Sequence, residues 1–114
     1  MKIIIKFLFF VFLLFLIISD KKIVEALDLG RGKQIFYANC TACHLGGNNI
    51  IIPEKNLKKD ALEANGMNNI DAITYQVTNG KNGMPAFGGR LSDEDIRTVA
   101  SYVIKESLTN FQEP

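Results

Sequence analysis

The sequence predicts an all-α domain. Apolar residues recur at helical spacing in several short segments, and Asn or Ser stands before these segments and Gly after some of them, as at helix ends. The segments between them are rich in Gly, Asn and Pro, and no convincing polar–apolar alternation indicates a strand. About four short helices are therefore expected, preceded by a distinct N-terminal segment.

The first 26 residues are expected to be a cleaved signal peptide. Lys2 and Lys6 give this segment a basic start, and the unbroken apolar run over residues 7–18 is shorter than the roughly 20 residues of a membrane-spanning helix. Val24 and Ala26 suit a cut after Ala26. Residues 27–114 would then form one domain, and an uncleaved membrane anchor is the alternative.

The predicted mature segment is nearly neutral. The leader takes four lysines and two acids from the totals of 13 Lys+Arg and 12 Asp+Glu, which leaves a net charge of −1. Such a balance gives no basic footprint for nucleic acid. A domain this small buries a modest core, so a disulfide, a metal or a cofactor is expected to stabilise it.

Three helices are expected before the last segment. The first covers residues 30–39 and runs directly into Cys40, and the second covers residues 57–64. The third covers residues 70–78, with apolar residues at i, i+3 and i+7. Asn69 is expected to cap its start, and the Asn79-Gly80 pair to end it through a left-handed residue.

The fourth helix has the clearest pattern. Ser92 and Asp95 form a variant of the capping box, and the acids at positions 93–95 favour the positive end of the helix dipole. One apolar stripe then follows at helical spacing, made of Ile96, Val99, Ala100, Val103 and Ile104. We expect this helix to pack against the first. Ile50, Ile51 and Ile52 are expected to lie in a loop, buried against a large apolar body.

Both cysteines and the only histidine form the pattern Cys-x-x-Cys-His at Cys40, Cys43 and His44. This spacing is typical of c-type haem attachment, because two thiols at a helix end can form thioethers to one haem edge while the next residue reaches the iron. One covalently bound haem c is therefore expected. The second ring N–H of His44 should donate to a carbonyl in residues 48–53, with Pro53 as the preferred partner.

Three other interpretations of the motif stay open at this point. A structural zinc site needs four ligands, and the chain would have to add a carboxylate to its three N/S donors. A thioredoxin-type pair belongs beside a βαβ unit, for which the sequence has no strand pattern. A plain disulfide between Cys40 and Cys43 is compatible with export to an oxidising compartment.

Met84 is the preferred second axial ligand of such a haem. It lies between Gly83 and Pro85, in a loop that is flexible before the sulfur and stiff after it. Met67 is expected to fill the core near the cofactor. Ligation by His and Met raises the reduction potential and leaves no open coordination position, which favours electron transfer over oxygen or peroxide chemistry.

Four segments together resemble the cytochrome c6 (cytochrome c-553) family: "CTACHLGGNNIIIPEKNL", "ALEANGM", "ITYQVTNGKNGMPAFGGRLSDEDI" and "VASYV". The resemblance covers nearly all of the mature segment. It implies the small class I cytochrome c fold, with about four short helices around one haem. It also implies that Cys40 and Cys43 carry the thioethers, that His44 and Met84 are the axial ligands, and that the protein is not an enzyme.

The same resemblance implies a soluble photosynthetic carrier in the thylakoid lumen of a plastid or cyanobacterium. Its electron donor would be the cytochrome b6f complex, through cytochrome f, and its acceptor photosystem I. Gln76 matches a family glutamine beside the haem that tunes the potential, and Arg90 matches an arginine implicated in docking. An apolar patch around the haem edge, bordered by residues 46–47 and 86–87, is the expected contact. The abundance of Ile, Lys and Asn favours a plastid gene.

Two rival functions stay open on the sequence alone. One is a periplasmic cytochrome c that donates electrons to a terminal oxidase. The other is a non-haem exported binding module with a Cys40–Cys43 disulfide. Neither rival involves nucleic acid, and in neither does the mature segment span a membrane.

Overall fold

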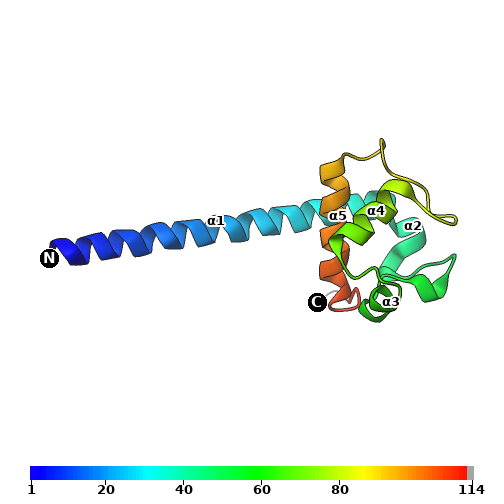
Figure 1. Cartoon of the computed structure of the whole chain (residues 1–114), viewed down its shortest axis with the longest axis horizontal. Coiled ribbons are helices and arrows are strands. Elements are labelled where there is room, and N and C mark those ends of the chain that lie inside the picture. Colours follow the sequence, from blue (N-terminus) through cyan, green and yellow to red (C-terminus); the bar gives the residue numbers. More distant parts are fainter. Residues whose placement is uncertain (113–114) are drawn as a thin grey trace.

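The structure is a computed structural model that describes residues 1–112. Within that range it contains five α-helices and two short 3-10 helices, and its β-type pairings are two isolated bridges. The all-α prediction is therefore confirmed. Helices α2 to α5 and the end of α1 gather into one body, and the rest of α1 projects away from it (Figure 1). The molecule measures 67 × 30 × 24 Å.

Helix α1 (Lys2–Asn39) is one continuous helix of 38 residues that joins the predicted leader to the first predicted helix. Its N-terminal apolar side chains are exposed, and an 18-residue window has a mean hydropathy of 2.6. By length and composition this helix could cross a membrane, and a signal sequence passes the same test. The twelve-residue apolar run therefore does not by itself separate a signal peptide from an anchor.

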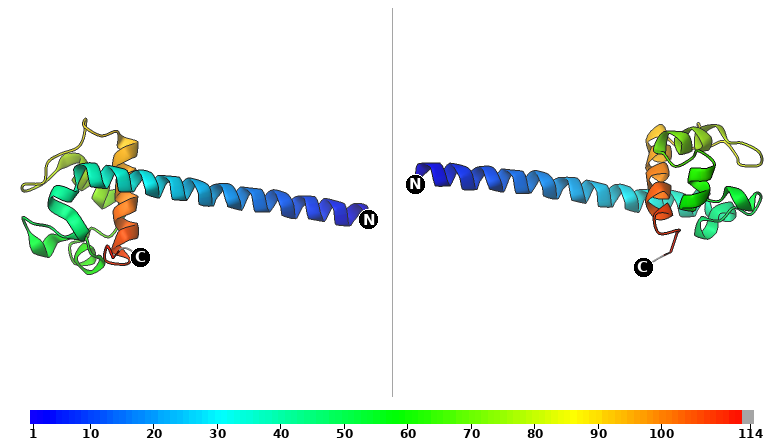
Figure 2. Two further views of the ribbon diagram at one scale, coloured as in Figure 1. Left: turned by 180° about the vertical axis from the view of Figure 1, so that it is seen from behind. Right: turned by 60° about the horizontal axis from the view of Figure 1, so that its bottom comes forward.

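The end of α1 crosses α5 (Asp93–Ser107), as predicted, and this crossing holds the core (Figure 2). Ile35 and Phe36 of α1 are buried, as are Ile96, Val99 and Val103 from the predicted stripe of α5. The backbones approach closely at Gly32, where an added β-carbon would lie 2.6 Å from the Tyr102 β-carbon. Glycine therefore allows the two helices to come into contact at this point.

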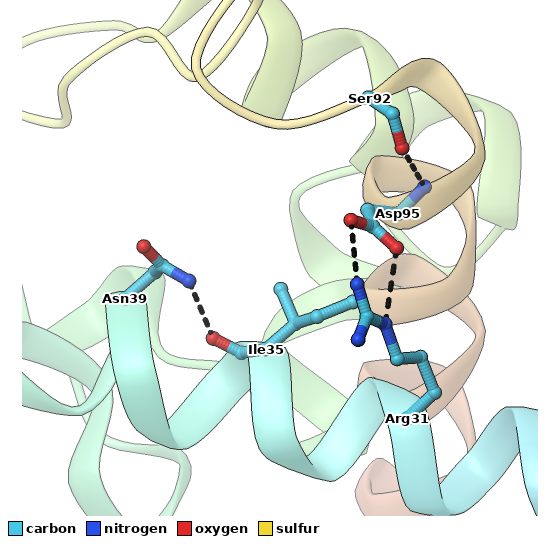
Figure 3. A network of polar contacts seen from close by, with 5 residues as sticks. All are labelled: Arg31, Ile35, Asn39, Ser92 and Asp95. Atoms are coloured by element: carbon cyan, nitrogen blue, oxygen red, sulfur yellow. Dashed lines mark hydrogen bonds and ion pairs between the residues drawn. The ribbon is translucent and has the colours of Figure 1, made fainter.

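An ion pair at the surface joins the same two helices (Figure 3). Arg31 donates two hydrogen bonds to the Asp95 carboxylate, Nε to Oδ1 at 3.2 Å and Nη2 to Oδ2 at 3.0 Å. These bonds raise the pKa of the Arg31 guanidinium. The predicted cap of α5 is confirmed, since Ser92 Oγ accepts the Asp95 N–H at 3.0 Å. The Asp95 carboxylate, expected to complete a capping box, binds Arg31.

Two shorter helices complete the body around the core. Helix α3 (Lys59–Ala64) begins two residues later than predicted, because Asn56 Oδ1 accepts the Lys58 N–H and holds Lys58 in extended backbone. Helix α4 (Ile70–Asn79) begins at the predicted cap, where Asn69 Oδ1 accepts the Ala72 N–H at 2.7 Å. It ends at Gly80, whose φ of 67° is positive as expected, but whose ψ of 173° lies outside the left-handed helical region.

Candidate functional site

The Cys-x-x-Cys-His motif begins at Cys40, between two helices, and continues through the second of them. Helix α1 ends at Asn39, and the four-residue helix α2 (Thr41–His44) follows at once. The Cys40 carbonyl accepts the N–H groups of Cys43 at 3.2 Å and His44 at 2.9 Å. This helical turn brings Cys40 and Cys43 to the wall of one cavity.

Both cysteines are free thiols in the structure, and each is partly buried. Burial raises the pKa of Cys40 to about 11, so its side chain is a neutral thiol at neutral pH. Among residues 1–112, no three His, Cys, Asp or Glu side chains form a group that could hold a metal ion. The zinc interpretation therefore has no support in this part of the chain.

The imidazole of His44 is oriented by the loop that follows it. Nδ1 lies 2.8 Å from the Asn48 carbonyl oxygen, and because a carbonyl only accepts, Nδ1 carries the proton. The lone pair of Nε2 is then available to a metal. The loop was predicted correctly but the residue was not: the acceptor is Asn48 and not Pro53, because the chain turns back within four residues.

A small hairpin presents Met84 to the same cavity. Lys81 and Met84 exchange two backbone hydrogen bonds, at 3.1 and 3.0 Å, across a turn in which Asn82 and Gly83 have φ of 46° and 85°. Two left-handed central residues are typical of a type I′ turn, and glycine takes this conformation at no steric cost. The partly buried Met84 side chain lines the cavity.

Gln76 contacts the Met84 sulfur. Its side-chain amide nitrogen on α4 lies 3.8 Å from Met84 Sδ, a distance compatible with a hydrogen bond to sulfur. Gln76 also lines the cavity. A donor at this place withdraws electron density from the thioether.

Replacing Gln76 with Val is expected to lower the reduction potential of the haem-loaded protein. A sulfur that donates less electron density to the iron favours the reduced iron. Removing the Gln76 amide makes the Met84 sulfur a stronger donor, which favours the oxidised iron. A hydrogen bond worth about 1 kcal/mol in one oxidation state alone corresponds to about 40 mV for one electron. Potentiometric titration measures the shift. Thr74→Val is the control on α4, since Thr74 lies outside the cavity lining and should leave the potential unchanged.

The predicted donor set, defined as the side chains of Cys40, Cys43, His44 and Met84, lines one cavity of about 340 Å³. The walls of the cavity are mainly apolar. They include Phe36, Ile51, Ile52, Leu57, Leu62, Met67, Ile73, Val77, Phe87, Val99 and Val103. Two thiols, a thioether and an imidazole with a free Nε2 in an apolar cavity fit a c-type haem. Met67 also lines the cavity, so the preference for Met84 as ligand stays a prediction.

The three consecutive isoleucines form a loop, as expected, but they do not share one environment. Ile51 and Ile52 line the cavity, whereas Ile50 does not and is 69% exposed. The expectation of burial is therefore wrong for Ile50, and Ile51 is also 53% exposed although it lines the cavity. The backbone N–H of Ile50 donates a hydrogen bond to the Cys43 carbonyl at 3.2 Å, in the turn that leads to this side chain.

Arg90 lies outside the cavity lining. Its exposed guanidinium stands over the Phe87 ring, 4.9 Å from the ring centroid, and Phe87 lines the cavity. Phe87 is only 6% exposed, and Gly47 is buried as well. Neither can border a surface patch as expected. Ala86 and Gly46 are exposed and remain candidates for that border.

Sequence reasoning missed Asn49, which holds the loop on one side of the cavity. Its Oδ1 accepts the N–H groups of Ile51 and Ile52 at 3.0 and 2.9 Å, and its Nδ2 donates to the Lys55 carbonyl at 2.9 Å. Asn side chains often bond to the backbone two residues further on, so an Asn in a Gly-rich loop was the available signal. Asn49 therefore stabilises this part of the cavity wall by bonding to the backbone of its own loop.

A comparison with protein families matches residues 28–103 to the family described as cytochrome C oxidase, cbb3-type, subunit III. Among characterised proteins, cytochrome c6 of Bumilleriopsis filiformis is 72% identical over 80 residues, which are 70% of this chain and 93% of that protein. Cytochrome c6 of Porphyra purpurea is 63% identical over 93 residues, or 82% of this chain and 84% of that one.

Solved structures agree with these sequence matches. Cytochrome c6 from the diatom Phaeodactylum tricornutum superimposes with a TM-score of 0.69 at 55% identity, over 72% of this chain and 97% of the diatom protein. An oxidized cytochrome from Arabidopsis thaliana superimposes with a TM-score of 0.74 at 32% identity, over 77% and 98% of the two chains. The match therefore spans nearly the whole of each solved protein.

Proposed function

The chain belongs to the cytochrome c6 family, a family of c-type cytochrome electron carriers, and from this membership we propose that it moves one electron from the cytochrome b6f complex to photosystem I. The observation that carries the proposal is the meeting of the donor set in one apolar cavity. Algal relatives at 72% and 63% identity favour photosynthetic over other electron transport. We place the mature protein in the thylakoid lumen.

In this proposal Cys40 and Cys43 would hold one haem through thioether bonds, and His44 and Met84 would bind its iron. When bound, such a haem supplies reversible one-electron chemistry at a raised potential. The chain's own residues orient the ligands: Asn48 fixes the His44 ring, and Gln76 contacts the Met84 sulfur. The apolar walls exclude water, and ligation by both His44 and Met84 would suit a carrier, since it would leave oxygen and peroxide no place to bind.

Residues 1–26 are a signal peptide that is removed after Ala26. The helix over this segment projects from the body, and its apolar side chains are exposed and lie outside the core. The family match begins at residue 28, directly after the proposed cut. Removal would leave the Arg31–Asp95 ion pair and the close approach at Gly32 in place, because both residues lie beyond the cut.

Docking to cytochrome f and photosystem I uses weak, short-lived contacts. The exposed guanidinium of Arg90, held over Phe87 beside the cavity, offers a positive charge to an acidic partner surface. Charges of this kind change the encounter rate and its salt dependence more than the affinity. The nearly neutral mature segment suits a shuttle that must dissociate quickly.

A second candidate is a periplasmic cytochrome that donates electrons to a terminal oxidase. The matching family model favours it, since its description names an oxidase subunit. The relatives at high identity favour the photosynthetic carrier instead. Kinetics with the two acceptors separates these functions.

Three measurements on the purified product of the full-length gene test the proposal. Its mass should equal residues 27–114 plus one haem, and its reduced spectrum should show a sharp α band. After a flash, photosystem I particles should oxidise it rapidly. The double variant Cys40→Ser, Cys43→Ser is the control and should lose the covalent haem. A mass equal to the polypeptide alone contradicts the haem site, and slow oxidation by photosystem I with rapid oxidation by a terminal oxidase supports the second candidate.

A further inference from the structure

The C-terminal turn after α5 is held in an unusual backbone conformation. Asn110 and Phe111 have φ of 52° and 59°, a region that bulky residues rarely occupy. The Phe111 N–H donates to the Glu106 carbonyl at 2.9 Å, which closes the turn over the end of the helix. Such a conformation persists where surrounding contacts determine it. The contacts of the Phe111 ring with its surroundings therefore determine this conformation.

The Phe111 ring packs between α1 and the turn after the Cys-x-x-Cys-His motif. Its centroid lies 5.8 Å from that of Phe36, with the ring planes at 35°. The ring also lies against the buried Gly47, so closely that a β-carbon there would overlap it. Gly47 has φ of 77°, so this turn depends on glycine for both space and conformation.

Gly47 directly precedes the residue that orients His44. The 3-10 turn η1 (Leu45–Gly47) is closed by the Asn48 N–H, which donates to the Leu45 carbonyl at 3.3 Å. The carbonyl of Asn48 then accepts the proton of His44 Nδ1 at 2.8 Å. A shift of the Gly47 α-carbon would move this carbonyl, because Asn48 is the next residue along the chain.

We propose that Phe111 is a positioning residue for His44: its ring presses on Gly47 and so holds the Asn48 carbonyl in place on Nδ1. The inference rests on the proposed function, in which His44 binds the haem iron. Orientation of an axial histidine by a carbonyl tunes its donor strength. A side chain at the C-terminus thus acts on a ligand far away in the sequence.

A neighbouring contact anchors the same turn. Asn110 Oδ1 accepts the N–H of Lys59 at 3.3 Å, at the start of α3. Leu62 of α3 lines the cavity, and the Gly47 carbonyl accepts the Leu57 N–H at 2.7 Å. The C-terminal turn therefore contacts both the start of α3 and the turn at Gly47. These two contacts fix the position of the Phe111 ring.

Hydrogen exchange at the Nδ1–H of His44 tests this role in the reduced, haem-loaded mature protein. Nitrogen-labelled histidine allows the proton to be followed by NMR, since the chain has one histidine. In Phe111→Ala we expect exchange about tenfold faster than in the wild type, at a rate that low denaturant concentrations do not change, because the opening is local. Phe111→Leu should restore most of the protection.

Ile104→Ala is the matched control, since Ile104 packs partly buried against the core but does not line the cavity. Any faster exchange in this variant should rise with denaturant, as global unfolding requires. Two results would overturn the positioning role. One is exchange in Phe111→Ala and Phe111→Leu that rises with denaturant as in Ile104→Ala, and the other is an exchange rate in both variants equal to that of the wild type. Loss of the haem spectrum in the wild-type protein would contradict the proposed function instead.

Discussion

Replacing Met84 with Ala is expected to lower the reduction potential by about 0.2 V, a quarter of the roughly 0.8 V range that axial ligands command. The thioether favours the reduced iron, and the variant loses that preference. Without the sulfur, exogenous ligands such as cyanide or imidazole should bind the oxidised protein readily. Potentiometric titration and ligand-binding spectra measure both effects.

Met67→Ala is the control, because Met67 lines the same cavity and has the same chemistry. This variant should lose about 2 kcal/mol of stability, as for other partly buried large-to-small changes, but keep its ligation. Its potential should stay within about 60 mV of the wild type, a tenfold change in a one-electron equilibrium. If Met67→Ala instead binds exogenous ligands and shows the larger shift in reduction potential, the axial ligand is Met67 and not Met84.

Features set by neighbouring residues could be predicted from the sequence. Asn69 and Ser92 were identified as caps and both make the expected bonds, because an N-cap depends on atoms two or three residues away. The apolar stripe of α5 was found for the same reason, since its period is local. The start of α3 was missed by two residues, because the Asn56 side chain competes with the helix for the Lys58 N–H.

Within the site, the motif spacing predicted haem attachment at Cys40, Cys43 and His44, and the structure places all three side chains on one cavity wall. Individual side-chain contacts between distant segments left no signal of this kind. Arg31 meets Asp95 across 64 residues, and Phe111 reaches Gly47 from the end of the chain. Periodicity and turn chemistry carry no information on such pairs, because tertiary packing alone brings them together.

Replacing Gly32 with Ala is expected to destabilise the mature protein by about 2 kcal/mol, within the 1–3 kcal/mol typical of overpacked cores. The new β-carbon would lie 2.6 Å from the Tyr102 β-carbon and 3.0 Å from the Thr98 carbonyl oxygen. Both atoms are attached to the rigid part of α5, so neither can turn aside, and the helices must move apart. This cost exceeds the gain of up to about 1 kcal/mol that Ala offers over Gly in a helix.

Gly30→Ala provides the matched control, since it makes the same change on α1 in open space, with no atom within 4 Å of the added carbon. Only the helix-propensity gain applies there, so the free energy of unfolding should rise by up to about 1 kcal/mol. Denaturant unfolding of both variants, followed by circular dichroism, should therefore give shifts of opposite sign. Equal stabilisation by Gly32→Ala and Gly30→Ala would mean that α1 and α5 do not approach closely at Gly32. The packing of the core around that crossing would then be wrong.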